Sequence, residues 1–119
     1  MKTVNVKEKF SLFSDYSNPR VIAEVNDCSV KAVKLKGEFI WHHHENEDEL
    51  FFVVKGTLRM KFRSHEATVK EGEFVVVPRG VEHCPAADEE VHILLIEPKS
   101  TLNTGNITNE RTVAQLERI

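Results

Sequence analysis

The sequence is poor in the residues that would assign it to several protein classes. It has two cysteines, Cys28 and Cys84, which lie far apart and form no Cys-x-x-Cys pair, so we expect free thiols in a reducing compartment. No apolar run approaches the roughly 20 residues of a membrane helix. The N-terminal residues contain no apolar core followed by a small-residue cleavage site. We therefore expect a cytoplasmic protein that has no membrane partner.

An excess of positive charge is also missing. The formal net charge is −3, the calculated pI is about 6.1, and the lysines and arginines are scattered. This distribution does not provide the basic surface that a nucleic-acid partner requires. With 119 residues, 40% of them hydrophobic, the chain can bury a core without disulfides or structural metals. We expect one domain over residues 1–119, with its core at about 21–97 and terminal arms at 1–20 and 98–119.

The middle of the chain is a succession of short apolar segments separated by turn-forming residues. We expect strands over residues 21–25, 29–36, 38–44, 50–55, 57–63, 67–70, 73–77 and 91–97. Some alternate, as Leu58 and Met60 do with Arg59 and Lys61, whereas others are apolar on both faces. Two packed sheets, or a barrel covered outside by another subunit, would bury both faces. We therefore expect an all-β jelly roll with short helical or irregular flanks.

The most informative stretch is the histidine triplet at positions 42 to 44 and the acidic segment after it. In a strand, His42 and His44 share one face and His43 points to the other. Glu49, at the start of the next apolar run, reaches the same place if the intervening residues turn. Imidazole nitrogens and a carboxylate are ligands of divalent transition metals. A register slip of a residue would put Asp48 or Glu47 in place of Glu49.

A second segment, GEFVVVPRGVEHCP, predicts a fourth ligand. It contains a short strand, then a tight loop at Pro78 and Gly80, and then His83 at the start of the next strand. Proline fixes its own φ and glycine admits conformations that other residues avoid, so such a loop returns the chain at a defined angle. We expect His83 to be directed at the site formed by the first segment.

Together the two segments resemble the paired motifs of the cupin superfamily. The matching pattern is Gly37-x4-His42-x-His44-x4-Glu49-x6-Gly56, followed by Gly72-x5-Pro78-x-Gly80-x2-His83. The resemblance covers residues 37–87, with two departures: Gly37 is one residue closer to the histidines than usual, and Ala87 replaces a frequent asparagine. It implies a small double-stranded β-helix barrel, frequently a homodimer. It also implies a divalent metal (Fe, Mn, Ni, Co or Zn) held by His42, His44, Glu49 and His83.

Several residues near these motifs have simpler interpretations. We expect His43, Phe39 and Trp41 on the outer face, where the two aromatics would suit a dimer interface. The acidic residues before Glu49 are expected in a solvated turn. Arg79, on the loop at the rim, is either a surface residue or an anchor for an anionic substrate.

Three further residues are assigned by their neighbours in sequence. Cys84 follows His83 and should point away from the metal as an inert apolar residue. His65 is expected at an exposed hairpin tip. His92 is either a hydrogen-bonded core residue, the interpretation we favour, or a group beside the metal site.

Two classes of function fit these expectations. The first is a metal-dependent enzyme acting on a small molecule, of the isomerase, decarboxylase or dioxygenase type, in which the metal polarises a carbonyl or activates dioxygen. Beyond the ligands, only Glu82 and His92 are candidates for a general base. The second class is a non-catalytic module that binds a small ligand or metal. The fold implied by the resemblance hosts both classes.

Overall fold

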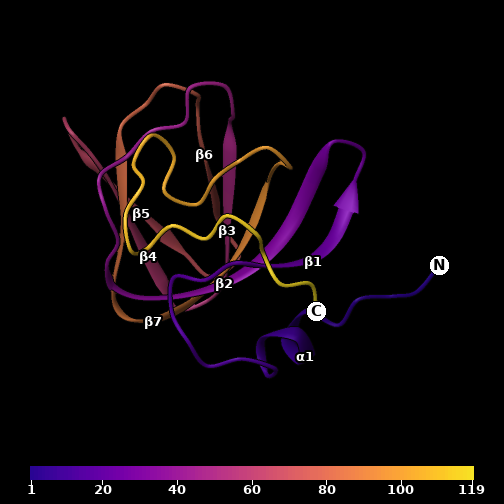
Figure 1. Cartoon of the computed structure of the whole chain (residues 1–119). Helices are drawn as coiled ribbons and strands as arrows, with labels where there is room; N and C mark the ends of the chain where they lie inside the picture. The colour runs from indigo at the N-terminus through magenta and orange to yellow at the C-terminus, as the bar shows by residue number, and fades with distance from the viewer.

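Seven strands and one short helix form the regular structure of the computed structural model, which describes residues 1–119. In chain order they are α1 (Val6–Phe10), β1 (Arg20–Val25), β2 (Cys28–Glu38), β3 (Glu49–Lys55), β4 (Thr57–Phe62), β5 (Glu66–Lys70), β6 (Phe74–Val77) and β7 (His83–Pro98). The strands roll into a barrel, with α1 and the N-terminal arm below it (Figure 1). This architecture confirms the expected all-β jelly roll with short flanks.

The long strand β7 organises the barrel. It pairs antiparallel with β2, β3 and β4, as in Leu35 opposite Val91, Phe51 opposite Leu95, and Met60 opposite Pro85. β1 extends the sheet beyond β2, β6 beyond β3, and β5 beyond β4. The first half of β7 therefore belongs to the wall that contains β4 and β5, and its second half to the wall that contains β3 and β6.

The core lies between these walls and follows from the alternation of each strand. Val91, Ile93 and Leu95 of β7 point inward, and Leu58 and Met60 of β4 face them. Each of these side chains is almost completely removed from water, which stabilises the fold by about 1.5–3 kcal/mol per large aliphatic residue. The alternation expected for residues 57–63, with Leu58 and Met60 inside, is thereby confirmed.

One expected strand, at residues 38–44, is wrong. β2 ends at Glu38, and residues 39–48 form no strand, although His42 makes an isolated bridge to His83. The Phe39 amide donates a hydrogen bond to the Pro85 carbonyl at 2.9 Å. Pro85 has no N–H, so it cannot donate the second hydrogen bond of the pair to the Phe39 carbonyl. The missing donor explains why a regular ladder does not continue from β2 into the histidine triplet.

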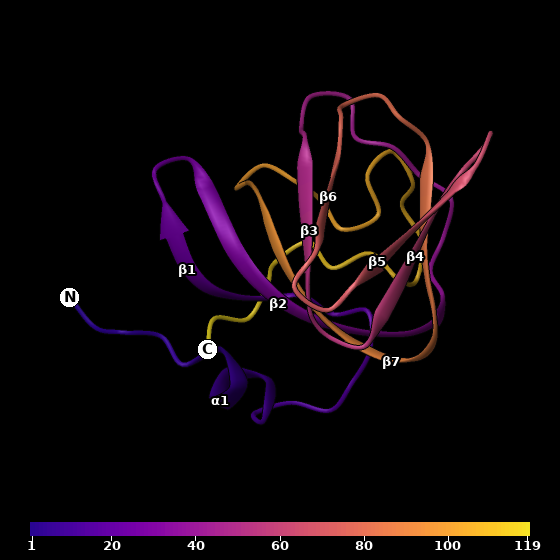
Figure 2. The ribbon, with the colours of Figure 1, turned by 180° about the vertical axis from the view of Figure 1, so that it is seen from behind.

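Both tails pack onto the barrel. At the N-terminus, Asn5 caps α1 by accepting a hydrogen bond from the Glu8 amide at 2.9 Å, and Phe10 stacks on His92. The C-terminal arm contains no helix and is of the irregular kind, and Arg118 bridges Val21 of β1 in parallel. The yellow C-terminal segment crosses the near side of the barrel in Figure 1 and lies behind the strands in Figure 2. The single helix α1 is too short to cross a membrane.

Candidate metal centre

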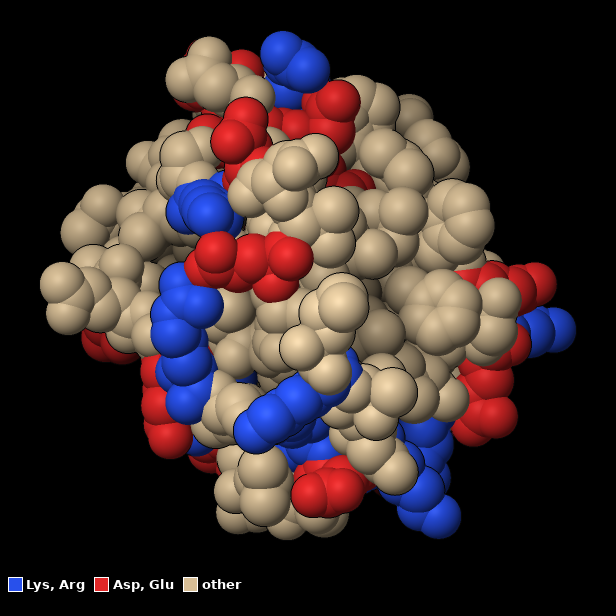
Figure 3. All heavy atoms as spheres, turned by 90° about the vertical axis from the view of Figure 1, so that its right-hand side faces the viewer, with Lys and Arg blue, Asp and Glu red and all other residues tan.

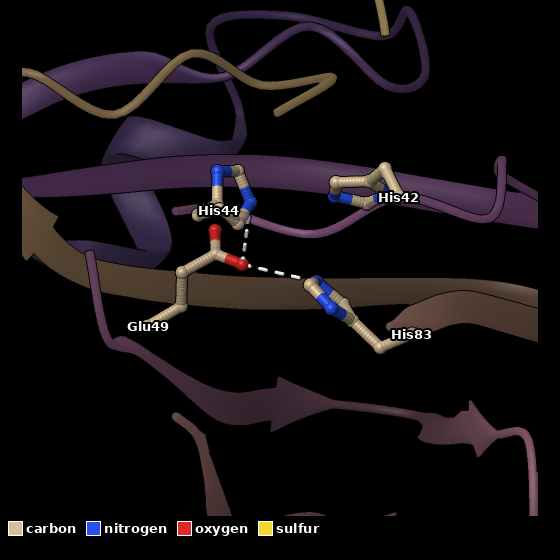
Figure 4. A group of neighbouring side chains, drawn as sticks. All are labelled: His42, His44, Glu49 and His83. Atoms are coloured by element: carbon tan, nitrogen blue, oxygen red, sulfur yellow. Dashed lines mark hydrogen bonds and ion pairs between the residues drawn. The ribbon is translucent and has the colours of Figure 1, made fainter. Parts of the chain in front are cut away.

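Four buried polar side chains converge at one end of the barrel. His42 and His44 come from the irregular segment 39–48, whereas Glu49 and His83 are the first residues of β3 and β7. All four are at most 4% exposed, and one ligand atom from each lies within 4.8 Å of the others. Figure 4 shows the three rings and the carboxylate pointing toward one another. The structure thus brings together the four residues selected from the sequence.

Backbone pairing fixes the positions from which these side chains project. His42 and His83 exchange two backbone hydrogen bonds of 3.0 and 2.9 Å, which makes them direct neighbours. Glu49 lies opposite Val77 in the ladder between β3 and β6. Two of the candidate ligands, His42 and His83, are therefore tied to each other, and a third, Glu49, is tied to the sheet.

The orientation of two rings is fixed by backbone carbonyls. Nδ1 of His42 lies 2.9 Å from the Ile40 carbonyl, and Nδ1 of His83 lies 2.9 Å from the Val81 carbonyl. When Nδ1–H donates to a carbonyl, Nε2 is left with a free lone pair. This arrangement is typical of metal-binding histidines, whose second nitrogen is held by an outer partner.

The carboxylate and the third ring match the spacing of a coordination shell. Glu49 Oε1 lies 2.9 Å from His44 Nε2 and 3.1 Å from His83 Nε2. Neighbouring ligands of an octahedral ion are about 3 Å apart when each bond is about 2.1 Å. Both buried ring nitrogens of His44 lack an aligned hydrogen-bond partner. A cation among the four side chains would satisfy the one that faces Glu49, so the residues fit a divalent metal.

The electrostatics of the site favour the ligand forms of its residues. Burial, and then the neighbouring His83 ring, lowers the pKa of His42 to about 4. Burial would raise the pKa of Glu49, but hydrogen bonds with Glu97, His44 and His83 outweigh it and hold that pKa well below its usual range. At neutral pH the site therefore presents a neutral imidazole at His42 and an ionised carboxylate at Glu49.

Sequence reasoning missed a buried ion pair behind the site. Glu97 and Lys31 are each 3% exposed, and Lys31 Nζ lies 2.7 Å from Glu97 Oε1. Burial raises the pKa of Glu97 well above its usual range, and the hydrogen bond and negative charge of Glu49 add to that rise. Every second residue of β7 from Val91 to Glu97 points inward, and this alternation is the sequence signal that could have placed Glu97 in the interior.

A cavity leads from the metal centre toward the two tails. It offers about 50 Å³ to the centres of water-sized molecules, which is room for a few waters or one small ligand. Its polar end is formed by His42, Glu49 and Glu97, and most of its wall is apolar. The N-terminal arm and the C-terminal segment also line it: Ser17, Pro19 and Asn103.

The other polar residues around the triplet have partners of their own. His43 Nε2 lies 2.7 Å from Glu45, Glu47 accepts from Ser100 at 2.8 Å, and Asp48 accepts from the Arg79 amide at 2.8 Å. The alternative register, with Asp48 or Glu47 in place of Glu49, is therefore wrong. Arg79 is an exposed residue paired with Asp48.

Two of the expected placements around the triplet are wrong. Phe39 does not face outward; it packs edge-on against His42 and lines the cavity. His92 is neither in the core nor beside the site, because it lies on the outer side of β7, under Phe10 and 2.7 Å from Glu90. The side chain of Trp41 is covered by Arg63, whose guanidinium lies 3.9 Å from the ring centroid.

Three smaller expectations can also be checked. Cys84 is buried, and burial raises the pKa of its thiol to about 11, as an inert residue requires. His65 is exposed at the β4–β5 hairpin. Glu82, considered as a general base, is an exposed partner of Arg63.

A small antiparallel barrel that directs three histidines and one glutamate into one end is the architecture of a cupin with a candidate metal centre. The chain belongs to the cupin family, because the family model described as Cupin domain matches residues 31–97. The matched segment begins in β2 and ends in β7, and it contains all four convergent residues.

Known proteins with similar sequences and structures support this assignment. The uncharacterized protein YdbB of Bacillus subtilis (strain 168) is 40% identical over 79 residues, which cover 66% of this chain and 64% of YdbB. The match thus spans less than two thirds of that relative. The crystal structure of a cupin-2 domain containing protein from Shewanella frigidimarina NCIMB 400 has a TM-score of 0.81 and 50% identity, covering 82% of this chain and 95% of that one. Protein NMB1881 from Neisseria meningitidis has a TM-score of 0.76 and 31% identity, covering 82% and 100%.

Proposed function

We propose that this cupin is a metal-dependent enzyme that acts on a small molecule, of the isomerase, decarboxylase or dioxygenase type. The observation that carries the proposal is the convergence of His42, His44, Glu49 and His83 in a buried end of the barrel. A bound divalent ion (Fe, Mn, Ni, Co or Zn) would act there as a Lewis acid on a carbonyl oxygen or, if iron, would activate dioxygen.

The chain's own residues would bind and shield the substrate. Phe39, Phe51 and Leu95 form an apolar wall beside the polar end of the cavity, which favours a small molecule with one polar end. Asn103 and Ser17 line the same cavity from the two tails and limit the access of water. Glu97 is the one cavity-lining carboxylate outside the ligand set.

The experiment that tests this proposal is a substrate screen on protein loaded with each of the five metals. The panel contains small hydroxy-ketones, keto acids and dihydroxy-aromatic compounds, and product formation is followed by mass spectrometry. Turnover that disappears in Glu49→Gln, which keeps the size of the side chain, supports the enzyme. Loaded protein that binds panel compounds but converts none of them contradicts it.

A non-catalytic binding module is the second candidate, and the small size of the cavity is compatible with it. A space of about 50 Å³ between two tails suits retention of a small ligand as well as turnover. Metal-dependent binding without product in the same screen would support this alternative.

We also propose that the protein is a homodimer. Two apolar rows cross the outer face of the wall formed by β2, β7, β3 and β6: Val30, Ile96, Leu50, Val76 and Ala32, Leu94, Phe52, Phe74. Phe74 is 60% exposed, Val76 46% and Ile96 39%. Viewed from the side of the β1–β2 hairpin, the molecule has a broad uncharged area bordered by charges of both signs (Figure 3). Ala32 is already buried within the chain, and a second copy on this face would cover the exposed remainder of the two rows, which no charged residue interrupts.

The extent of the functional unit and its compartment are further parts of the proposal. We propose that residues 1–119 act as one domain, because both terminal arms line the cavity. A cytoplasmic location is supported by Cys28 and Cys84, which are unpaired.

A further inference from the structure

The segment that bears His42 and His44 is held by the C-terminal part of the chain. Residues 39–48 form no strand, so most of their backbone groups have no ladder partner. We call residues 100–113 the strap. The His43 amide donates to Asn106 Oδ1 at 2.9 Å, and the Asn106 amide donates to the His43 carbonyl at 3.0 Å. Both backbone groups of the residue between two candidate ligands are thus bound by one strap residue.

The strap runs in direct contact with this segment. Gly105 has a φ of +58°, and a Cβ added there would lie 2.2 Å from the His43 carbonyl oxygen and 3.1 Å from Cδ2 of the His42 ring. No side chain fits in that space. The approach of the two backbones therefore depends on glycine at this position.

The strap is itself firmly held, which allows it to support another segment. Thr104 is completely buried, and its hydroxyl lies 2.7 Å from that of Thr112. The Asn103 side chain accepts from the Val113 amide at 2.9 Å and donates to the Arg111 carbonyl at 2.8 Å. Arg111 in turn donates to the Glu38 carbonyl at 3.1 Å, at the end of β2.

From this geometry we infer that the strap completes the metal centre, with Asn106 as the positioning residue that sets His42 and His44 through the backbone of His43. The inference rests on the proposed metal site. The strap lies outside residues 31–97, so the family match does not include it. His42 is also held by its backbone bridge to His83, and the His44 carbonyl accepts from the Gly80 amide at 2.7 Å. Asn106 adds the contact between these two anchors, so a displacement of His43 would disturb the orientation of both neighbouring side chains, whereas Glu49 and His83 are held by β3 and β7.

The strap also lines two hollows beside the candidate metal centre. Asn103 lines the cavity, and Leu102, Gly105 and Asn106 line a shallow hollow on the outer side of His44. Release of the metal toward this side requires the strap to move away from His43. We therefore expect Asn106 to influence the rate of metal release as well as the affinity.

The test uses Co²⁺ as the probe, with full-length protein and three variants. Asn106→Ala removes the acceptor for the His43 amide, and Asn106→Asp keeps an acceptor oxygen. Asn109→Ala is the matched control, because Asn109 Oδ1 accepts a hydrogen bond from the Arg111 amide within the strap and makes no hydrogen bond to His43. Co²⁺ affinity by chelator competition, the release rate and the d–d absorption spectrum are measured for each protein.

We expect Asn106→Ala to weaken Co²⁺ binding about tenfold, to release the ion faster and to shift the d–d bands. Asn106→Asp and Asn109→Ala should retain the wild-type affinity and spectrum. In the metal-free protein, the His43 amide should exchange with solvent faster in Asn106→Ala than in Asn109→Ala. A general loss of stability would not produce this difference, because it would affect both variants alike.

The possible results separate the strap from the proposed function. Wild-type affinity, release rate and spectrum in Asn106→Ala would overturn the inference and leave the metal site intact. Wild-type protein that binds no Co²⁺ would overturn the metal site and with it the positioning role of Asn106. In that case, unchanged exchange of the His43 amide in Asn106→Ala would show in addition that the strap does not hold the segment.

Discussion

Buried titratable side chains are concentrated at one end of a small barrel, and His42 is the best defined of them. Its ring is held by the Ile40 carbonyl and lies against His83, and burial lowers its pKa to about 4. In an unfolded chain the same imidazole titrates near 6.5. Folding therefore requires His42 to remain neutral in a pH range where the unfolded chain would protonate it.

The first prediction is a loss of stability of the metal-free protein on acidification. Between about pH 6.5 and about pH 4 the unfolded chain binds a proton that folded His42 does not, so stability falls as the pH falls through this window. The contribution of His42 is about 3 kcal/mol over the whole window. Urea unfolding at several pH values measures it. His42→Gln should lose less stability than the wild type over the same range, and identical pH profiles would contradict this prediction.

At the level of single residues, the sequence predicted the convergence of the four candidate ligands better than their surroundings. His42, His44, Glu49 and His83 were found because ligands must come from fixed positions next to turns, and such spacing is visible locally. Glu97 was missed because it lies at the end of an apolar strand, and its partner Lys31 is 66 residues away. The proximity of such a pair depends on strand register, which local patterns do not define.

Among the glycines that directly join two strands, Gly56 in the turn between β3 and β4 has the closest neighbour. Gly56 has a φ of +91°, and a Cβ added there would lie 2.9 Å from the Glu90 carbonyl oxygen of β7. Gly72 has a similar φ of +81°, but a Cβ there would meet nothing within 4 Å. A side chain at Gly72 would meet backbone strain alone, whereas one at Gly56 would meet both strain and a steric clash. Substitutions at the two positions therefore separate the two costs.

The second prediction compares alanine substitutions at these two glycines. Gly72→Ala should cost about 1–2 kcal/mol of unfolding free energy, because alanine is strained at positive φ. Gly56→Ala should cost at least about 1 kcal/mol more, because it also forces β7 away from the turn. Chemical denaturation of both variants measures the difference. Equal losses would show that the contact with Glu90 does not constrain the barrel.

The strand expected at residues 38–44 shows why an element can be wrong while its residues are assigned correctly. His42 and His44 point to one site and His43 points elsewhere, as an extended chain requires, but the ladder is broken opposite Pro85. Pro85 is more than forty positions from His42, and only the fold reveals that the two segments are neighbours. Composition predicts an extended segment but not its partner.

The whole molecule combines a closed core with an apolar outer wall. The fold class was predictable because short apolar strands and turn residues recur along the chain. The paths of the terminal arms were not, since their few apolar residues do not specify which part of the barrel they cover. The wall formed by β2, β7, β3 and β6 explains the strands that are apolar on both faces: one side meets the core and the other is exposed.

The third prediction tests whether a second copy covers this wall. Phe74→Lys places a charge at the exposed end of the second apolar row, on β6, and should shift the protein from dimer to monomer in light scattering after size-exclusion chromatography. Val25→Lys is the control, because Val25 is equally exposed at 60% but lies at the end of β1, outside the two apolar rows. A wild-type protein that is monomeric at high concentration would contradict the dimer.

The most direct test of the central claim is a metal measurement on protein purified without an affinity tag, beside His44→Ala and His43→Ala. These two variants remove neighbouring rings of one triplet, of which one points into the site and the other toward Glu45. After saturation with a divalent transition metal and removal of the excess, elemental analysis should give one equivalent for the wild type and for His43→Ala, and much less for His44→Ala. Equal retention by all three proteins, or no retention by the wild type, would contradict a metal centre at this end of the barrel.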